Sequence, residues 1–418
     1  MQTQSSHQGT HQVSIFRQVL RRDKIALSLI FLIMLMDVVG MTILFPISAY
    51  VVQQYSHEAL MVTLLSVSYA AAQFFAAPVL GKISDRVGRR PVLLVCLAGA
   101  GAGYLMFGLG GALWVLLLSR VIAGITGGSI STASAYIVDS SKPEELANAF
   151  TLVGMAWGIG LVLGPALGGA LGQFNLRAPA FFSAVLAMVN MVLAIFYLPE
   201  SLPKERRETR SMRLSDFNTF QSIGAMGRLP GLAVVLAVTC LFNFAFNAMN
   251  STETLFIIRR FAAEPWQIGL MTMLAGIAIA VVQALFVDRL VARLGEAGVA
   301  FICLLLQMAG ALLMVYNYVF VMIYPIVVLR SAASGFIFPT LGTLSAKRVS
   351  YREQGLLMGV TTSLNSLMGI ISPVLAGLLY DHWSPGAPYW LAAVFFVAGA
   401  FLLRLSRPLA PRLDKAVS

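Results

Sequence analysis

Two charged residues stand inside long apolar stretches in the first half of this sequence. Asp37 lies within the apolar run 25–52, and Arg120 lies within the run 91–138. A carboxylic acid can accept and release a proton, whereas a guanidinium can bind an anion or balance a nearby carboxylate. Because ionisable side chains are costly in an apolar medium, they are functional candidates by default. The two residues therefore predict a site that exchanges protons or binds a charged small molecule.

The depth of these residues in their apolar runs supports the same interpretation. Asp37 lies about 20 Å beyond Lys24 along a helix, and Arg120 lies about 12 Å from the outer end of the second helix that its run can form. The two side chains can therefore approach each other within the first half of the chain. The alternative is a structural Asp–Arg pair that only joins two helices.

The composition indicates which elements position these residues. Of the 418 residues, 58% are hydrophobic and 11% are charged, whereas soluble domains carry about 25% charged residues. So much apolar surface requires lipid, and about 20 apolar residues cross a bilayer as one helix. The apolar runs predict twelve such helices: 25–52, 60–80, two within 91–138, 146–176, 178–199, 230–252, 265–287, two within 297–346, 354–380 and 384–403.

An internal repeat divides the chain into two halves. Residues 164–169 match 372–377 after a shift of 208, and Asp85 falls on Asp288 after a shift of 203. Duplicated halves with a site between them are typical of secondary transporters. We therefore expect an all-α membrane protein with twelve transmembrane helices in two pseudo-symmetric six-helix halves. The expected segments are a cytoplasmic tail 1–23, a half 24–199, a cytoplasmic linker 200–229, a half 230–405 and a cytoplasmic tail 406–418.

The distribution of charge predicts the orientation of the helices. The net charge is +11, and a basic chain can also indicate nucleic-acid binding. Here the basic residues form short runs between apolar stretches, so they indicate membrane orientation instead. With both termini in the cytoplasm, the only Lys or Arg residues in the outer loops are Arg177, Arg259 and Arg260.

Enzymatic and metal-binding functions have no support in the residue patterns. The three cysteines, Cys96, Cys240 and Cys303, lie in apolar stretches without metal-ligand spacing, so we expect free thiols. The sequence shows no nucleophile–base arrangement, metal motif or phosphate-binding loop. We expect no catalytic site, no cofactor, no metal and no nucleic-acid partner.

A charged loop follows the second predicted helix. Asp85 lies on the same side of the membrane as the start of the run 354–380, and a carboxylate suits the positive end of a helix dipole. The loop is therefore a candidate latch between the two halves, and an ordinary positive-inside loop is the alternative. The residues that we assign to this gating loop are Gly81, Asp85, Arg86, Gly88, Arg89 and Arg90.

These patterns together resemble the major facilitator superfamily. The loop 81–91 looks like the signature of that family between its second and third helices, and 116–124 looks like its fourth-helix motif. The segment 37–46 resembles the first helix of drug antiporters of the tetracycline and multidrug type. In the second half, Ser372 replaces a glycine of the pattern, and the glycine corresponding to Gly81 is missing.

The resemblance implies roles for further residues. Asp139 looks like the acidic partner that the family provides for the loop arginines, and we pair it with Arg89. The segment 160–169 looks like the fifth-helix motif of proton-coupled antiporters. Small residues permit close helix contacts, and a proline bends a helix, so this segment is a candidate hinge, with tight packing as the alternative. The hinge residues are Gly160, Gly164, Pro165, Gly168 and Gly169.

Polar and aromatic residues within the predicted helices can line a central cavity. Interhelical hydrogen bonding is the alternative role for the polar ones. The candidate lining residues are Tyr69, Gln73, Phe242, Asn243, Phe246, Asn247, Arg330 and Asn365.

The sequence predicts a secondary active transporter that works by alternating access. We expect proton-coupled efflux of lipophilic or cationic small molecules, by a monomer in the lipid bilayer of a bacterial-type inner membrane. One alternative is a proton symporter or facilitator for a sugar or organic anion, with Arg120 and Arg330 as anion contacts. A membrane sensor or scaffold that does not transport is an alternative from another class.

Overall fold

The computed structural model describes residues 28–140, 146–207, 231–350 and 353–405. These residues form helices and no strand. Eleven of their helices are long and apolar enough to cross a membrane. A shorter apolar helix, Ser28–Thr42, continues through a turn into α2 (Ser48–Gln53) and supplies the first span. The expected all-α membrane fold with about twelve spans is confirmed, whereas the expected tails 1–23 and 406–418 lie outside the described residues.

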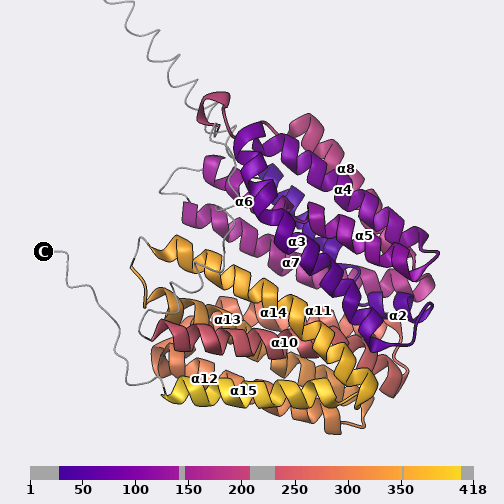
Figure 1. The fold of residues 1–418 in the computed structure, drawn as a ribbon, viewed down its shortest axis with the longest axis vertical. Coiled ribbons are helices and arrows are strands. Elements are labelled where there is room, and N and C mark those ends of the chain that lie inside the picture. Colours follow the sequence, from indigo (N-terminus) through magenta and orange to yellow (C-terminus); the bar gives the residue numbers. More distant parts are fainter. Residues whose placement is uncertain (1–27, 141–145, 208–230, 351–352, 406–418) are drawn as a thin grey trace, which may run out of the picture.

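The first half of the chain forms one group of helices, coloured indigo to magenta in Figure 1. The fourth span is broken at Gly127 and Gly128, which separate α5 from α6. A short 3-10 helix, η2 (Lys204–Arg206), follows the group. The helices are α3 (Ala59–Val87), α4 (Arg89–Leu109), α5 (Leu113–Thr126), α6 (Ser129–Ser140), α7 (Leu146–Phe174) and α8 (Ala178–Tyr197).

The second half forms the neighbouring group, coloured from red through orange to yellow in Figure 1. A short 3-10 helix, η4 (Phe320–Met322), leads into its fourth long helix. The helices are α10 (Leu232–Phe261), α11 (Pro265–Leu285), α12 (Val287–Tyr316), α13 (Ile323–Ala346), α14 (Gln354–His382) and α15 (Ala387–Leu405).

The two groups repeat each other helix by helix. Helices α7 and α14 both have 29 residues, and their first residues are 208 positions apart. Gly88 ends α3 with a φ of 117°, and Gly295 interrupts α12 with a φ of 68°, backbone conformations that suit glycine. These two glycines are 207 positions apart, so the shift of 203 inferred at this loop is wrong by about one helical turn. Asp288 therefore lies one turn before the structural equivalent of Asp85.

Two helix pairs make most of the contacts between the halves: α7 with α11, and α3 with α14 (Figure 1). A Cβ atom added to Gly169 would lie 2.7 Å from the Cα atom of Gly269, so both helices need glycine at their crossing. A Cβ atom added to Gly377 would likewise lie 2.8 Å from the Cα atom of Leu60. Both contacts lie away from the loop 81–90. We call the end of the bundle with this loop the basic end, and the other end the distal end.

The same two helix pairs leave open space toward the basic end. Gly158 lies within about 20° of the direction of Gly169 around α7, but nothing lies within 4 Å of a Cβ atom added to it. Gly359 points in about the same direction as Gly377 around α14, and it also faces open space. The halves therefore touch from the distal end to the middle of α7, where Gly276 packs on Leu161, and leave open space beyond that point toward the basic end.

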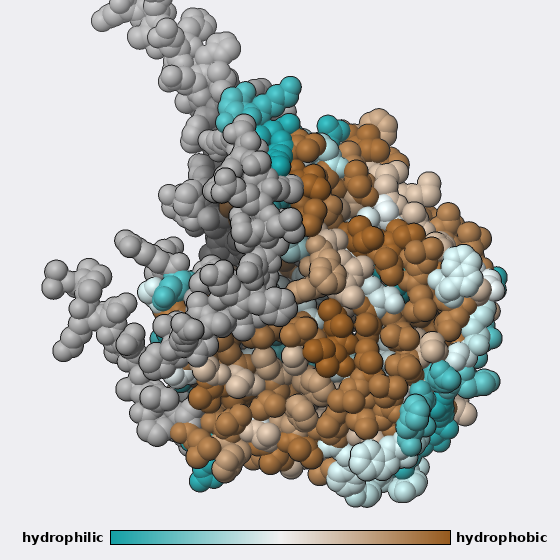
Figure 2. All heavy atoms as spheres, in the orientation of Figure 1, coloured by the Kyte–Doolittle hydropathy of each residue, from teal (hydrophilic) through white to brown (hydrophobic). Residues whose placement is uncertain are grey.

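The outer surface of the bundle is apolar. Figure 2 shows hydrophobic residues over most of the visible face, with hydrophilic residues gathered toward the ends of the helices. Many large hydrophobic side chains are exposed, among them Phe75, Phe196 and Phe401. Such a surface is stable only against lipid tails, which agrees with the membrane-spanning lengths of the helices.

The glycine crossing between α7 and α11 can be tested by substitution. We expect Gly269→Ala to lower the apparent Tm of the purified protein, because its methyl group overlaps Gly169 and overpacking costs about 1–3 kcal/mol. Gly359→Ala makes the same chemical change where space is open, so its Tm stays unchanged or rises with helix propensity. Equal apparent Tm values for the two variants in detergent would contradict the assigned close contact.

Candidate functional site

Asp37 makes a short hydrogen bond across the first half. The hydroxyl group of Ser129 donates to Oδ2 of Asp37 at 2.6 Å. Ser129 is the first residue of α6, directly after the break at Gly127 and Gly128, so the break positions its side chain. Asp37 is partly exposed although Val38 and Val39 beside it are buried. Within the described residues Asp37 forms no ion pair, so this carboxyl group can exchange a proton or meet a cation.

Arg120 is buried and faces aromatic rings instead of a carboxylate. Its guanidinium carbon lies 4.7 Å from the ring centroid of Phe107 and 5.7 Å from that of Tyr104. Its Nε and Nη2 atoms are buried and make no hydrogen bond within the described part of the chain. Aromatic faces partly compensate a buried cation. The direct contact with Asp37 that the sequence allowed is not formed in this structure.

Two side chains of α3 complete the polar group in the first half. Gln73 donates from Nε2 to the carbonyl oxygen of Gly127 at 3.0 Å. Tyr69 lies one turn earlier, where its hydroxyl contacts the sulfur of Met41 at 3.5 Å. Both residues are partly buried, and Tyr69 lies within Coulombic range of Asp37 and Arg120. The structure thus gathers Asp37, Arg120, Tyr69 and Gln73 around the broken span, together with Ser129, which sequence reasoning missed.

The candidate residues of the second half separate into two sets. Arg330 donates from Nη1 to Oε1 of Glu253 at 2.6 Å, and both side chains are buried. Phe242 packs in an aromatic cluster with its ring centroid 5.2 Å from that of Phe338, and Asn243 is buried beside it. These lining candidates therefore lie inside the second half. The other set is partly exposed and consists of Phe246, Asn247 and Asn365.

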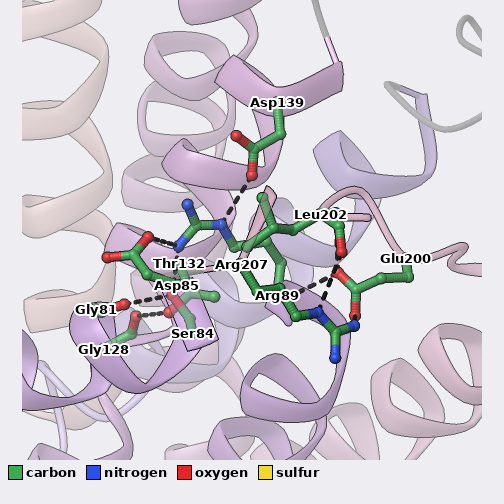
Figure 3. A network of polar contacts seen from close by, with 10 residues as sticks. All are labelled: Gly81, Ser84, Asp85, Arg89, Gly128, Thr132, Asp139, Glu200, Leu202 and Arg207. Atoms are coloured by element: carbon green, nitrogen blue, oxygen red, sulfur yellow. Dashed lines mark hydrogen bonds and ion pairs between the residues drawn. The ribbon is translucent and has the colours of Figure 1, made fainter. Parts of the chain in front are cut away.

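The gating loop is organised around Arg89 (Figure 3). Its Nη1 atom lies 2.6 Å from Oδ1 of Asp85, and its Nε atom donates to Oδ2 of Asp139 at 2.8 Å. Nη1 also donates to the hydroxyl of Ser84 at 2.6 Å. The ion pair between Arg89 and Asp139, which the family resemblance implied, is present. It joins the start of α4 to the end of α6 within one half.

Glu200 adds a partner that sequence reasoning missed (Figure 3). Its Oε1 atom accepts a hydrogen bond from the backbone nitrogen of Arg89 at 2.8 Å, and Oε2 lies 3.8 Å from Nη2 of Arg207. The loop is therefore held by the segment that follows α8. Other loop positions behave differently: Gly81 faces open space, and Arg90 donates to the carbonyl oxygen of Ile195.

The second half carries an ion pair at the equivalent place with reversed charges. Glu296 follows Gly295 as Arg89 follows Gly88, and it pairs with Lys347. Lys347 is the C-cap residue of α13, and Asp139 occupies the equivalent place near the end of α6. The structural repeat is thus preserved while the positions of cation and anion are exchanged.

The candidate hinge has two packed faces. Gly160 accepts, through its carbonyl oxygen, a hydrogen bond from the hydroxyl of Thr42 at 2.9 Å. Gly164 and Gly168 also face the first helix and the turn that follows it. Gly169 faces the other half, and the carbonyl oxygen of Pro165 points toward Gly269 there. The motif therefore lets α7 contact the first span and α11 together.

The described part of the chain shows no candidate metal site. Among those residues, no group of three or more His, Cys, Asp or Glu side chains lies close enough to hold a metal ion. The polar group around Asp37 consists instead of a carboxyl, a guanidinium, two hydroxyl groups and an amide. Such a set can bind protons and charged or polar organic groups.

Known proteins are similar to this one in sequence and in fold over most of the chain. The family model described as Major Facilitator Superfamily matches residues 30–283 and 235–418. The class C tetracycline resistance protein of Escherichia coli is 32% identical, over 88% of this chain and 92% of that protein. Multidrug resistance protein 2 of Bacillus subtilis (strain 168) is 27% identical, over 80% of this chain and 83% of that protein. The crystal structure of the nucleoside transporter NupG has the same fold, with a TM-score of 0.74, 14% identity, and coverage of 92% of this chain and 100% of that one.

The pair of Arg89 and Asp139 can be tested with a double-mutant cycle. We expect Arg89→Gln and Asp139→Asn each to lower the apparent Tm, and the double variant to lose less than the sum of the two. Interacting residues of this kind show coupling of about 0.5–3 kcal/mol. Arg90→Gln removes a neighbouring cation and serves as the control, with additive effects when combined with Asp139→Asn. Additivity of the Arg89 and Asp139 substitutions would contradict a stabilising pair.

Proposed function

Because the chain belongs to the Major Facilitator Superfamily and is a transporter of that type, we propose that it exports lipophilic or cationic small molecules in exchange for protons. The observation that carries this proposal is the carboxyl group of Asp37. It lies inside the first half, bonded to Ser129, partly exposed and without an ion-pair partner within the described residues. A carboxyl group in this position can hold either a proton or a cationic substrate group, and exchange of one for the other is the basis of antiport.

The shape of the bundle supports access from the basic end. Gly359 faces open space near that end and Gly158 faces open space near the middle of α7, whereas Gly169 and Gly377, toward the distal end, are packed against the other half. Positively charged loops remain in the cytoplasm, so we assign the basic end and both chain termini to the cytoplasmic side of a bacterial-type inner membrane. The conformation is then open to the cytoplasm, as an exporter must be when it collects its substrate.

A coupled cycle follows from these positions. Ionised Asp37 attracts a cationic group that enters from the cytoplasmic side, and closure of that side exposes the pair to the outside. A proton from outside then neutralises the carboxylate and weakens its attraction for the cation, which leaves. The protonated side chain costs less to carry through the membrane interior than a bare carboxylate, so the empty protein returns with a proton. One polypeptide contains the complete polar group, which supports a functional monomer.

The relatives support efflux as the direction of transport. The proteins with 32% and 27% identity are named for tetracycline resistance and multidrug resistance, respectively. Partly exposed aromatic rings suit lipophilic compounds, and each half contributes one: Tyr69 in the first half and Phe246 in the second.

Arg120 favours a second candidate substrate class. Its guanidinium is buried beside Phe107 and lacks a carboxylate partner within the described residues. A cation in that state is a receptor for an organic anion, which would make the protein a symporter or facilitator. Arg330 does not support this alternative, because Glu253 already neutralises it.

Proteoliposomes with an imposed pH gradient test the proposed exchange. We expect a fluorescent lipophilic cation to move against its gradient while protons move in the opposite direction, as followed by an internal pH indicator. We expect Asp37→Asn to reduce coupled flux by at least about tenfold, because the amide neither binds a proton nor attracts a cation.

Glu205→Gln is the matched control, because Glu205 is an exposed carboxylate in η2, outside the spans. Its coupled flux should equal that of the unsubstituted protein. Normal proton-driven efflux by Asp37→Asn would refute the role of Asp37. Flux of organic anions that is lost in Arg120→Gln would replace the cation proposal with the anion alternative.

A further inference from the structure

Asp381 joins the two halves at the distal end. It lies in the last turn of α14, and its carboxylate reaches the start of α3 in the other half. Oδ1 accepts a hydrogen bond from the backbone nitrogen of Ala59 at 2.8 Å, and Oδ2 accepts one from that of Leu60 at 2.9 Å. The first amide groups of a helix have no partner within the helix, and the positive end of the helix dipole favours a carboxylate. Asp381 therefore acts as the N-terminal cap of α3 from the opposite half.

The sequence around α3 does not supply this cap itself. Glu58 occupies the N-cap position, but its side chain makes no capping hydrogen bond. Helices are usually capped by a Ser, Thr, Asp or Asn at that position. The free amide groups of Ala59 and Leu60 are thus satisfied by Asp381 when the halves are in contact. When the halves separate, water must replace the carboxylate.

Further contacts hold the same segment. Arg259, at the end of α10, donates to the carbonyl oxygen of His57 in the first half. The Tyr50 hydroxyl donates to the carbonyl oxygen of Ala263 at 2.5 Å. Gly377, one turn before Asp381, lets the backbone of α14 approach Leu60. The segment from α2 to the start of α3 is therefore held by α10, the turn after α10 and α14 of the other half, and Asp381 provides the anionic contact.

We propose that Asp381 is a conformational latch: its two hydrogen bonds to the start of α3 hold the distal end closed, and they break when that end opens. The proposal rests on alternating access in the proposed function, but not on the substrate or on proton coupling. Because the separated carboxylate and amide groups are both solvated, the latch is reversible, and it sets the balance between the two open states.

A comparison of the two ends of the α3–α14 pair shows why this latch depends on the conformation. Helix α3 carries Asp85 near its last residue, and α14 carries Asp381 near its last residue, so each helix has a carboxylate at the same end of the bundle as the start of its partner. In this structure Asp85 pairs with Arg89 in its own half, whereas Asp381 is engaged with the other half. Only the distal latch is closed, in agreement with the contacts at Gly377 and the open space at Gly359.

Distance measurements between spin labels test the latch without a transport assay. Labels on Val87→Cys and Leu294→Cys, exposed residues of the two halves, report the basic end. Labels on Leu109→Cys and Tyr318→Cys, also exposed, report the distal end. We expect Asp381→Asn to lengthen the distal distances and shorten the basic ones, with the population ratio of the two states changed by about tenfold, since the amide weakens a charge-assisted contact.

Glu58→Gln is the matched control, because it removes the same charge beside the same helix start without removing a capping bond. Ala59→Pro removes one donor instead of the acceptor, and it should shift the populations in the same direction as Asp381→Asn. It also tests the latch if Asp381→Asn does not fold. Cys240→Ala is included throughout, because Cys240 is the partly exposed native thiol. Distance distributions unchanged by Asp381→Asn or Ala59→Pro, or changed equally by Glu58→Gln, would overturn the proposal.

Discussion

The cost of placing a polar group in hydrocarbon without a partner determines most of this architecture. Backbone groups meet this cost through helices, which is why helices form every described span. The charged side chains meet it in three ways. Glu253 and Arg330 neutralise each other, Arg120 lies against aromatic rings, and Asp37 has only a hydroxyl donor. Asp37 and Arg120 both lack an oppositely charged partner within the described residues, and a proton or a cation completes the environment of Asp37. The proposed transport cycle uses that incomplete compensation.

Glycine contacts connect this local chemistry to motion of the halves. At the crossing of α7 and α11, Gly169 and Gly269 bring two backbones into contact without interlocking side chains. Interlocked side chains would have to unpack before the helices could tilt, whereas a backbone contact can act as a pivot. The Asp37 helix packs on the other face of α7 through Gly160 and Gly164. A change in the tilt of α7 is therefore transmitted directly to the helix that carries the carboxyl group.

The sequence predicted features that depend on local pattern and missed those that depend on which helices meet. Apolar runs predicted the spans, and the family resemblance implied the pairing of Arg89 with Asp139. Ser129 was missed because its role depends on the break at Gly127, and a serine in an apolar helix has no distinctive pattern. Asp381 and Gly269 were missed because they act across the two halves. The loop of the second half was placed one turn away, because matching charges guided the comparison while the kink at Gly295 sets the structural register.

The reversed ion pair of the second half bears on how a duplicated chain folds correctly. In each half, the third helix of the group must find its own neighbour among similar helices as they enter the membrane. If α4 packed by mistake against α13, Arg89 would meet Lys347, and if α12 packed against α6, Glu296 would meet Asp139. Both errors bring like charges together, whereas the correct partners attract. The inversion therefore makes the two copies chemically distinguishable, and it guards a repetitive chain against exchanging equivalent parts during assembly.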